Sequence, residues 1–222
     1  MPAKIEINDE VAIITMDDGK ANAINPTMLT ALNACLDEAE ASAKAVVLTG
    51  RPERFSAGFD LKLMASSPPD EVVSLVKAGG RLALRLHQFK TPVIVASTGH
   101  AIAMGCFILL ASDLRIGADG PYKVGANETV INMVLPVFAL ELLKARIPAR
   151  FLTQSAINGQ LYSPHEAVAT GFLDEVTAPD KVLETALQHA HALKAISGPA
   201  YHSNKKLIRK ATLDAIAPTV AA

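Results

Sequence analysis

The amino-acid sequence predicts an α/β fold that ends in a helical region. Short apolar runs rich in β-forming residues alternate with longer segments in which apolar residues recur at helical spacing, from residue 11 to residue 116. After Pro136 the strand signals almost vanish and only the helical spacing continues. No internal repeat and no linker rich in Gly, Ser or Pro divides the sequence. We therefore expect a single domain over residues 1–222, with an αβ core to about residue 135 and a helical region over about 136–222.

The first half of the predicted core begins with a strand over residues 11–16, which ends at the turn signal Asp17-Asp18-Gly19. A helix is expected next, because Asn25 suits the N-cap and Pro26 suits the first helical position. Residues 45–49 then form a short apolar run, typical of a strand that is covered on both faces.

The second half repeats this order. Pro69-Asp70 begins another predicted helix, and residues 92–96 and 114–116 are the next predicted strands. Strands that alternate with helices favour parallel pairing through right-handed crossovers. Residues 101–111 form the longest apolar run, which is too short to cross a bilayer, so we interpret it as a core element.

The composition argues against a nucleic-acid partner. The chain is 50% hydrophobic and 19% charged, and its net charge is -1, with neither sign gathered in long blocks. The one basic cluster comprises Lys205, Lys206, Arg209 and Lys210. Its helical spacing favours a solvated helix face, and phosphate binding is the alternative.

The two cysteines and the N-terminus indicate a soluble cytoplasmic protein without a membrane partner. Cys35 and Cys106 lie far apart in apolar surroundings, as buried reduced thiols do. The first residues, MPAKIE, lack the charged and then apolar pattern of a secretory signal.

Several kinds of site are excluded by their missing patterns. The sequence has no glycine-rich dinucleotide motif, no phosphate loop and no Gly-x-Ser-x-Gly elbow. His189 and His191 are two residues apart and so point to different faces of a helix, which argues against a shared metal. Ser56 has no histidine in a recognisable pattern near it, which argues against a nucleophilic serine. We expect no metal and no redox cofactor.

Two turns carry the strongest signal for chemistry. The segments FSAGFD at residues 55–60 and GHAIAMGC at residues 99–106 each come between a predicted buried strand and a helix. Small residues let the backbone approach a ligand, and the first N–H groups of a helix lack partners within it. One such turn would most simply be a tight connection. Two together can direct two N–H groups at one oxygen, which is the arrangement of an oxyanion hole.

These segments, followed by SDLRI at residues 112–116, resemble the crotonase (enoyl-CoA hydratase/isomerase) family. The resemblance runs from about Ile5 to about Thr177 and includes NAIN at residues 22–25 and AVATGFLD at residues 167–174. It implies a crotonase-like spiral of ββα units with C-terminal helices that form trimers, often paired into hexamers. It also implies an acyl-CoA thioester as the ligand, so that coenzyme A is part of the substrate and no separate cofactor is needed.

The resemblance also assigns site residues. The backbone N–H groups of Ala57 and Met104 would form the oxyanion hole. Residues 56–60 would lie along the CoA, and residues 20–23 would approach its adenine and phosphates. Lys62 is either a phosphate partner or a plain exposed lysine. The implied binding residues are Lys20, Ala21, Ala23, Ser56, Ala57, Gly58, Phe59, Asp60, Gly105 and Phe107.

The choice of reaction depends on carboxylates. Hydratases of the family carry two glutamates that position water; the first of these positions is Phe107 here, and the second is Glu128. Taken alone, Asn127-Glu128-Thr129 is also consistent with a plain polar turn. One glutamate beside an apolar residue suits proton transfer, as in the Δ3,Δ2-enoyl-CoA isomerases of the family. We expect the surroundings of Phe107 to exclude water and to raise the pKa of Glu128.

Alternatives remain open at this point. A hydratase could use Glu128 with water held by other groups, and a non-catalytic member would bind acyl-CoA without turnover. Thioester hydrolysis and decarboxylation are further options. Residues 130–136 depart from the glycine-rich continuation of hydratases, and the alanine-rich end predicts a shortened or missing final helix, with consequences for the acyl pocket and the trimer contacts. The length of the acyl chain is not predicted.

Overall fold

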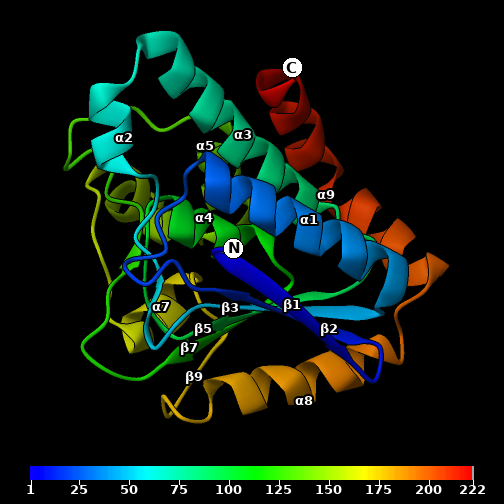
Figure 1. The fold of residues 1–222 in the computed structure, drawn as a ribbon. Helices are drawn as coiled ribbons and strands as arrows, with labels where there is room; N and C mark the ends of the chain where they lie inside the picture. Colours follow the sequence, from blue (N-terminus) through cyan, green and yellow to red (C-terminus); the bar gives the residue numbers. More distant parts are fainter. Residues whose placement is uncertain (222) are drawn as a thin grey trace.

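A six-stranded sheet forms the centre of the computed structural model, which describes residues 1–221 (Figure 1). Its strand order is β1-β2-β3-β5-β7-β9, with β1 and β2 antiparallel and every other pair parallel. The strands are β1 (Ala3–Asn8), β2 (Val11–Met16), β3 (Ala45–Thr49), β5 (Val93–Ser97), β7 (Leu114–Ala118) and β9 (Glu175–Thr177).

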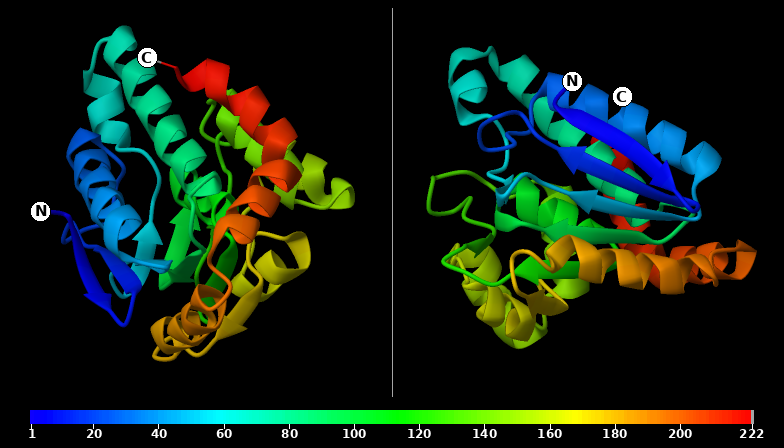
Figure 2. Two further views of the ribbon diagram at one scale, coloured as in Figure 1. Left: turned by 90° about the vertical axis from the view of Figure 1, so that its right-hand side faces the viewer. Right: turned by 60° about the horizontal axis from the view of Figure 1, so that its bottom comes forward.

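Helices cover both faces of this sheet. Most of them lie on one face, and α8 (Val182–Lys194) lies alone on the other (Figure 1). The long final helix, α9 (Pro199–Val220), runs alongside α3 (Pro69–His87) and α5 (Val137–Arg146) (Figure 2). The other helices are α1 (Pro26–Ser42), α2 (Leu61–Ser66), α4 (Met104–Ala111), α6 (Ala149–Leu152), the π-helical turn η1 (Thr153–Ile157) and α7 (Pro164–Thr170).

Alternate residues of the central strands enter two separate cores. Val46 and Val95 pack into the larger core beneath α1, α3, α4 and α5. Val47 and Ile94 pack into a smaller core beneath α8. Neighbouring side chains of a strand point to opposite faces, so a strand between two helical layers must be apolar throughout. The prediction of strands covered on both faces is confirmed.

A second, three-stranded sheet positions the candidate site. It consists of β4 (Glu53–Ser56), β6 (Gly99–Ile102) and β8 (Val124–Gly125), paired in parallel in the order β4-β6-β8. The sequence predicts turns in the places of β4 and β6, and that part of the prediction is wrong; it predicts no element at β8. Because parallel strands run in one direction, the segments that follow all three strands emerge at the same edge.

The predicted elements of the core are otherwise found where they were expected. Asn25 caps α1, its side chain accepting from the Met28 N–H at 3.0 Å, and α3 begins at Pro69. The sequence missed β1 and β9, two strands at the edges of the central sheet. The final helix, for which the sequence predicts shortening or loss, is present in α9 with 22 residues.

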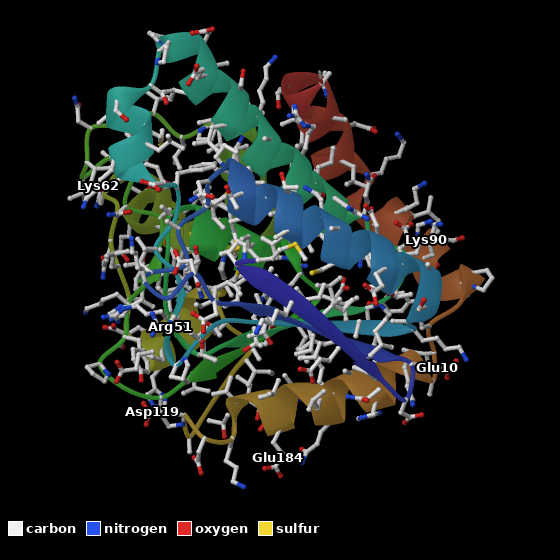
Figure 3. The ribbon with its side chains drawn as sticks, in the orientation of Figure 1. Glu10, Arg51, Lys62, Lys90, Asp119 and Glu184 are labelled. Carbon is white, nitrogen blue, oxygen red and sulfur yellow. The ribbon has the colours of Figure 1, made fainter. Side chains whose placement is uncertain are left out.

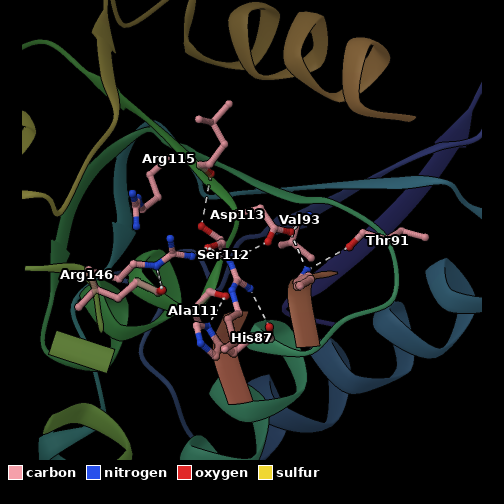
Figure 4. Close-up of polar contacts among 12 residues, drawn as sticks. His87, Thr91, Val93, Ala111, Ser112, Asp113, Arg115 and Arg146 are labelled. Carbon is pink, nitrogen blue, oxygen red and sulfur yellow. Dashed lines mark hydrogen bonds and ion pairs between the residues drawn. The ribbon is translucent and has the colours of Figure 1, made fainter. Parts of the chain in front are cut away.

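The basic cluster of α9 is only in part a solvated face. Lys205 and Arg209 pair with opposite carboxylate oxygens of Asp113, at 2.7 and 2.8 Å. Arg209 also donates to the carbonyl oxygen of His87, at the end of α3. Figure 4 shows the polar contacts around His87 and Asp113. Lys206 and Lys210 alone are exposed. The interpretation as a solvated face is therefore corrected for Lys205 and Arg209, which fasten α9 to the core.

The other polar predictions concern cysteines and histidines. Cys35 and Cys106 are free and buried. His189 lies 3.0 Å from Glu175 and His191 lies 3.5 Å from Asp9, so the two histidines face different partners. Within residues 1–221, no three His, Cys, Asp or Glu side chains are grouped as metal ligands would be. No helix in the same range has the length and apolar character needed to cross a membrane.

Burial of His87 predicts a loss of stability in acid. Burial, together with Arg209 and Arg146 nearby, lowers the pKa of His87 from 6.5 to about 3. The buried neutral imidazole makes its full contribution to the free energy of unfolding above pH 6.5. That contribution is lost as the pH falls from 6.5 towards 3. At pH 4.5 we expect this residue to lower the free energy of unfolding by about 3 kcal/mol relative to pH 7. Urea unfolding of wild type and His87→Gln at both pH values isolates this loss, and equal losses in the two proteins would contradict the assignment.

Candidate active site

Three chain segments meet at one edge of the small sheet. Residues 57–60 follow β4, Ala103 and Met104 follow β6, and Asn127 and Glu128 follow β8. A pocket of about 190 Å³ opens between these segments. It is lined by Ala57, Phe59, Leu61, Ile102, Ala103, Asn127, Glu128, Ile131 and Met133.

Buried hydrogen bonds fix the first turn. The side chain of Asn22 is fully buried and donates to the carbonyl oxygens of Met16 and Phe55, at 3.0 and 3.1 Å. The Ser56 hydroxyl donates to the Asn22 carbonyl oxygen at 2.8 Å and accepts from the Gly58 N–H at 3.2 Å. Ser56 therefore holds the turn in place, and its hydroxyl is not a free nucleophile.

The backbone of this turn presents the N–H of Phe59 and not that of Ala57. The Ile24 N–H donates to the Gly58 carbonyl oxygen at 2.8 Å, and the Asp60 N–H donates to the Ile24 carbonyl oxygen at 3.1 Å. The Phe59 N–H between them points away from Ile24 and has no hydrogen-bond partner in residues 1–221. The Ala57 N–H donates to the Ala21 carbonyl oxygen at 3.0 Å. The prediction that the Ala57 N–H is an oxyanion donor is therefore wrong, because this N–H is already hydrogen-bonded to Ala21.

The second turn presents the N–H of Met104. Ala103 adopts φ 52° and ψ −124°, a strained conformation for a residue with a side chain, and its N–H donates to Gly125. Met104 is the first residue of α4, and its N–H has no hydrogen-bond partner in the described chain.

Gly58 allows the two turns to touch. It has φ +92°, and a Cβ atom there would lie 2.7 Å from the Ala103 Cβ and 3.2 Å from the Met104 nitrogen. Any larger residue would force the two turns apart. The glycine thus lets the free N–H groups of Phe59 and Met104 lie close together.

Glu128 brings a carboxyl group to the pocket. It is 6% exposed, and its Oε2 has no hydrogen-bond partner. Burial raises its pKa from 4.5 to about 7, which confirms the predicted direction. No other Asp or Glu in residues 1–221 is buried. The adjacent Asn127 also has a buried Oδ1 without a partner.

Phe107 and Gly105 lie behind the wall of the pocket. The Phe107 ring is 1% exposed and packs edge-on against Phe138, with 5.8 Å between ring centroids. Gly105 is packed against the backbone of Ser56. Neither residue is among those that line the pocket, and their contact with a ligand stays a prediction.

The residues expected on the CoA side lie beside the first turn. Ala21 accepts the bond from Ala57, and the Lys20 and Ala23 N–H groups donate to Asp18 at 2.7 and 3.1 Å. Asp60 caps α2 through the Leu63 N–H, and Lys62 is exposed and points outward (Figure 3). The loop of residues 20–23 is thus hydrogen-bonded to the turn, while the Asp60 carboxylate accepts a backbone N–H at the start of α2.

Some features of the pocket were missed by the sequence analysis. Ile102, Ile131 and Met133 line it, and Asn127 adds an unpaired acceptor. The alternation of N–H directions along an extended segment could have selected Phe59, but only if the pairing of residues 58–60 with Ile24 had been known. Chemically, the site has two free N–H donors and one carboxyl group, which suit an oxyanion and a proton transfer.

Comparison with known proteins gives consistent matches over the whole chain. The family model described as "Enoyl-CoA hydratase/isomerase" matches residues 6–221. Among curated proteins, the mitochondrial enoyl-CoA delta isomerase 1 of Homo sapiens is 34% identical over 206 residues, 91% of this chain and 68% of that protein. A putative enoyl-CoA hydratase of Thermus thermophilus is 30% identical over 208 residues, 89% of this chain and 80% of that protein. Among solved structures, an enoyl-CoA hydratase/isomerase family protein from Pseudomonas syringae has a TM-score of 0.96 and 38% identity, covering 99% of this chain and 95% of its own.

Proposed function

Since the chain belongs to the enoyl-CoA hydratase/isomerase family, we propose that it is an enoyl-CoA isomerase that moves a double bond from position 3 to position 2 of the acyl chain. The observation that carries this proposal is the single carboxyl group of the pocket. Glu128 is the one ionisable side chain among the lining residues. Isomerisation needs one group that takes a proton and returns it, whereas the hydratases of the family use two glutamates.

Proton transfer by Glu128 accounts for the reaction without any other group. The Glu128 carboxylate removes a proton from C2, and the electrons of that C–H bond form an enolate on the thioester. The same proton then returns to C4 as the double bond shifts to C2–C3, so the substrate neither gains nor loses atoms. A pKa of about 7 suits a group that must act first as base and then as acid.

The enolate oxygen is held by the N–H groups of Phe59 and Met104. Both donors are backbone groups without other partners in residues 1–221, so they need no rearrangement to bind the oxygen. Each such donor stabilises the transition state by roughly 2.7–4 kcal/mol. The α4 N-terminus, where Met104 lies, adds the positive end of a helix dipole.

A panel of substrates tests the proposal. We expect conversion of 3-enoyl-CoA esters to 2-enoyl-CoA esters, followed as a gain of the conjugated-thioester absorbance. Hydration of 2-enoyl-CoA esters should be much slower. Rapid hydration with no isomerisation would overturn the proposal in favour of a hydratase, and binding without turnover of either ester would indicate a non-catalytic member.

The pKa of Glu128 predicts the dependence of activity on pH. The carboxylate is the reactive form, so kcat/KM should fall about tenfold per pH unit below a midpoint near 7. Initial rates on one 3-enoyl-CoA between pH 5 and pH 9 give this midpoint. A midpoint near 4.5, the ordinary value for a glutamate, would mean that the group is not buried in the working enzyme.

A hydratase is the second candidate, and Asn127 is the observation that favours it. The Asn127 Oδ1 and the Glu128 Oε2 are both buried acceptors without partners, and both residues line the pocket. Buried acceptors require donors, and a water molecule between these two atoms would supply them. The test is the hydration rate of 2-enoyl-CoA in Asn127→Leu: a selective loss of hydration with isomerisation retained would assign this side activity to the asparagine.

Other expectations remain predictions from the family resemblance. These are the contact of residues 20–23 and 56–60 with CoA, the trimer or dimer of trimers, the cytoplasmic location, and a substrate that brings its own coenzyme A.

A further inference from the structure

The size of the pocket limits what it can hold. Its volume is about 190 Å³, below the range of roughly 300–1,000 Å³ that is usual for sites which enclose a whole ligand. The CoA portion must therefore lie outside. A water molecule takes about 30 Å³ in the liquid and a methylene group needs a similar space, so the pocket has room for only a few such groups. This corresponds to the thioester carbonyl and a short carbon chain.

Phe59 is one of the residues that line the pocket, and its ring packs against a glycine. Phe59 lines the pocket, and a Cβ atom at Gly79 of α3 would lie 2.5 Å from its Cζ and 2.7 Å from its Cε1. The Met104 sulfur lies 3.5 Å from the same Cβ position. The ring thus fills the space between the pocket and helix α3, and it cannot retreat further towards the helix.

Two other lining residues offer little cover for a longer chain. Leu61 and Ile131 line the pocket and are themselves exposed, at 53% and 38%. An acyl chain that extends past them enters solvent and buries little additional apolar surface. Chain length should therefore influence binding only until the pocket is full.

We propose that the pocket is built for short acyl chains of about four to six carbons, and that the packing of Phe59 on Gly79 sets this limit. The inference rests on the proposed function, since it names the class of substrate for that site. The Phe59 backbone N–H serves the oxyanion and its ring sets the length. One residue thus joins the two tasks.

Binding of saturated acyl-CoA esters of four to twelve carbons tests the limit, because these esters need no turnover. Each methylene that enters an apolar pocket raises affinity about fourfold. We expect the affinity of the wild type to rise about fourfold per carbon from four to six carbons and to stay within about twofold from six to ten. A continued fourfold rise through ten carbons would overturn the proposal.

Two variants test the role of the ring. Phe59→Ala keeps the N–H and opens the space towards α3, so the rise should continue for at least two more carbons, with a gain of about fifteenfold for the eight-carbon ester over the six-carbon ester. Gly79→Ala should push the ring into the pocket and end the rise at four carbons. Val73→Ala, an exposed position on the same helix, is the matched control and should bind like the wild type. If the affinity of Phe59→Ala depends on chain length as that of the wild type does, the ring does not set the limit.

The same proteins separate this inference from the proposed function. Conversion of 3-enoyl-CoA esters with the best rate at ten carbons or more, and no plateau in binding, would refute the length limit and leave the isomerase intact. A plateau at six carbons without conversion of any enoyl ester would refute the isomerase and leave the length limit intact.

Discussion

The Glu128→Gln variant is expected to lose about 10³-fold in kcat for isomerisation of a 3-enoyl-CoA, within the 10²–10⁴-fold typical of a lost acid–base group. Glutamine has the shape of glutamate but can neither take nor return a proton. Binding of a saturated acyl-CoA should change by less than about threefold, because the amide fills the same space. Steady-state kinetics and titration of the ester give both quantities.

The same substitution is expected to stabilise the fold. Burial raises the pKa of Glu128 from 4.5 to about 7, so the folded protein holds this proton more tightly than the unfolded chain does. Stability is therefore lost as the pH rises from 4.5 to 7, and the cost above pH 7 is at most about 3 kcal/mol. An uncharged glutamine avoids this cost. At pH 8 the variant should unfold at a higher temperature than the wild type.

This pair of effects distinguishes catalysis from structure. Replacing a residue that only supports the fold lowers stability and activity together. Glu128→Gln should instead raise the stability of the fold and abolish the activity. Glu184→Gln is the control, since Glu184 is an exposed carboxylate on α8 (Figure 3), the helix that lies alone on one face of the central sheet. Activity retained in Glu128→Gln would exclude the proposed mechanism.

The central sheet was predictable because burial on both faces marks the sequence strongly. Residues 45–48 and 93–96 are apolar throughout, and α1 and α3, the helices that precede these strands, begin at proline with clear spacing. β9 escaped because it has three residues, Glu-Val-Thr, at an edge of the sheet, where neither length nor apolar character marks a strand. The local hydrophobic pattern of a sequence therefore predicts strands and helices that are long and buried, and misses short strands at an edge.

The site was predictable only in outline. The sequence placed Met104 and Glu128 from motifs, yet β4, β6 and β8 have at most four residues each, and the pattern of β4 and β6 predicts turns. Their pairing decides which N–H groups are free. Ala57 was chosen from its place in the motif, but the bond to Ala21 comes from a loop 36 positions earlier, and only the fold reveals it.

Met104→Pro is expected to lower kcat by 10²–10³-fold through the loss of one oxyanion donor, roughly 2.7–4 kcal/mol of transition-state stabilisation. Proline suits this position, since Met104 is the first residue of α4 and its N–H bonds to nothing else in residues 1–221. Ala103 is outside the α region, the conformation that a following proline disfavours. Met104→Ala is the matched control: it removes the same buried side chain but keeps the N–H. Because the methionine side chain is lost in both variants, their difference in kcat measures the replacement of the N–H donor by the proline Cδ. Equal kcat values in correctly folded Met104→Pro and Met104→Ala would show that the enolate oxygen is held elsewhere.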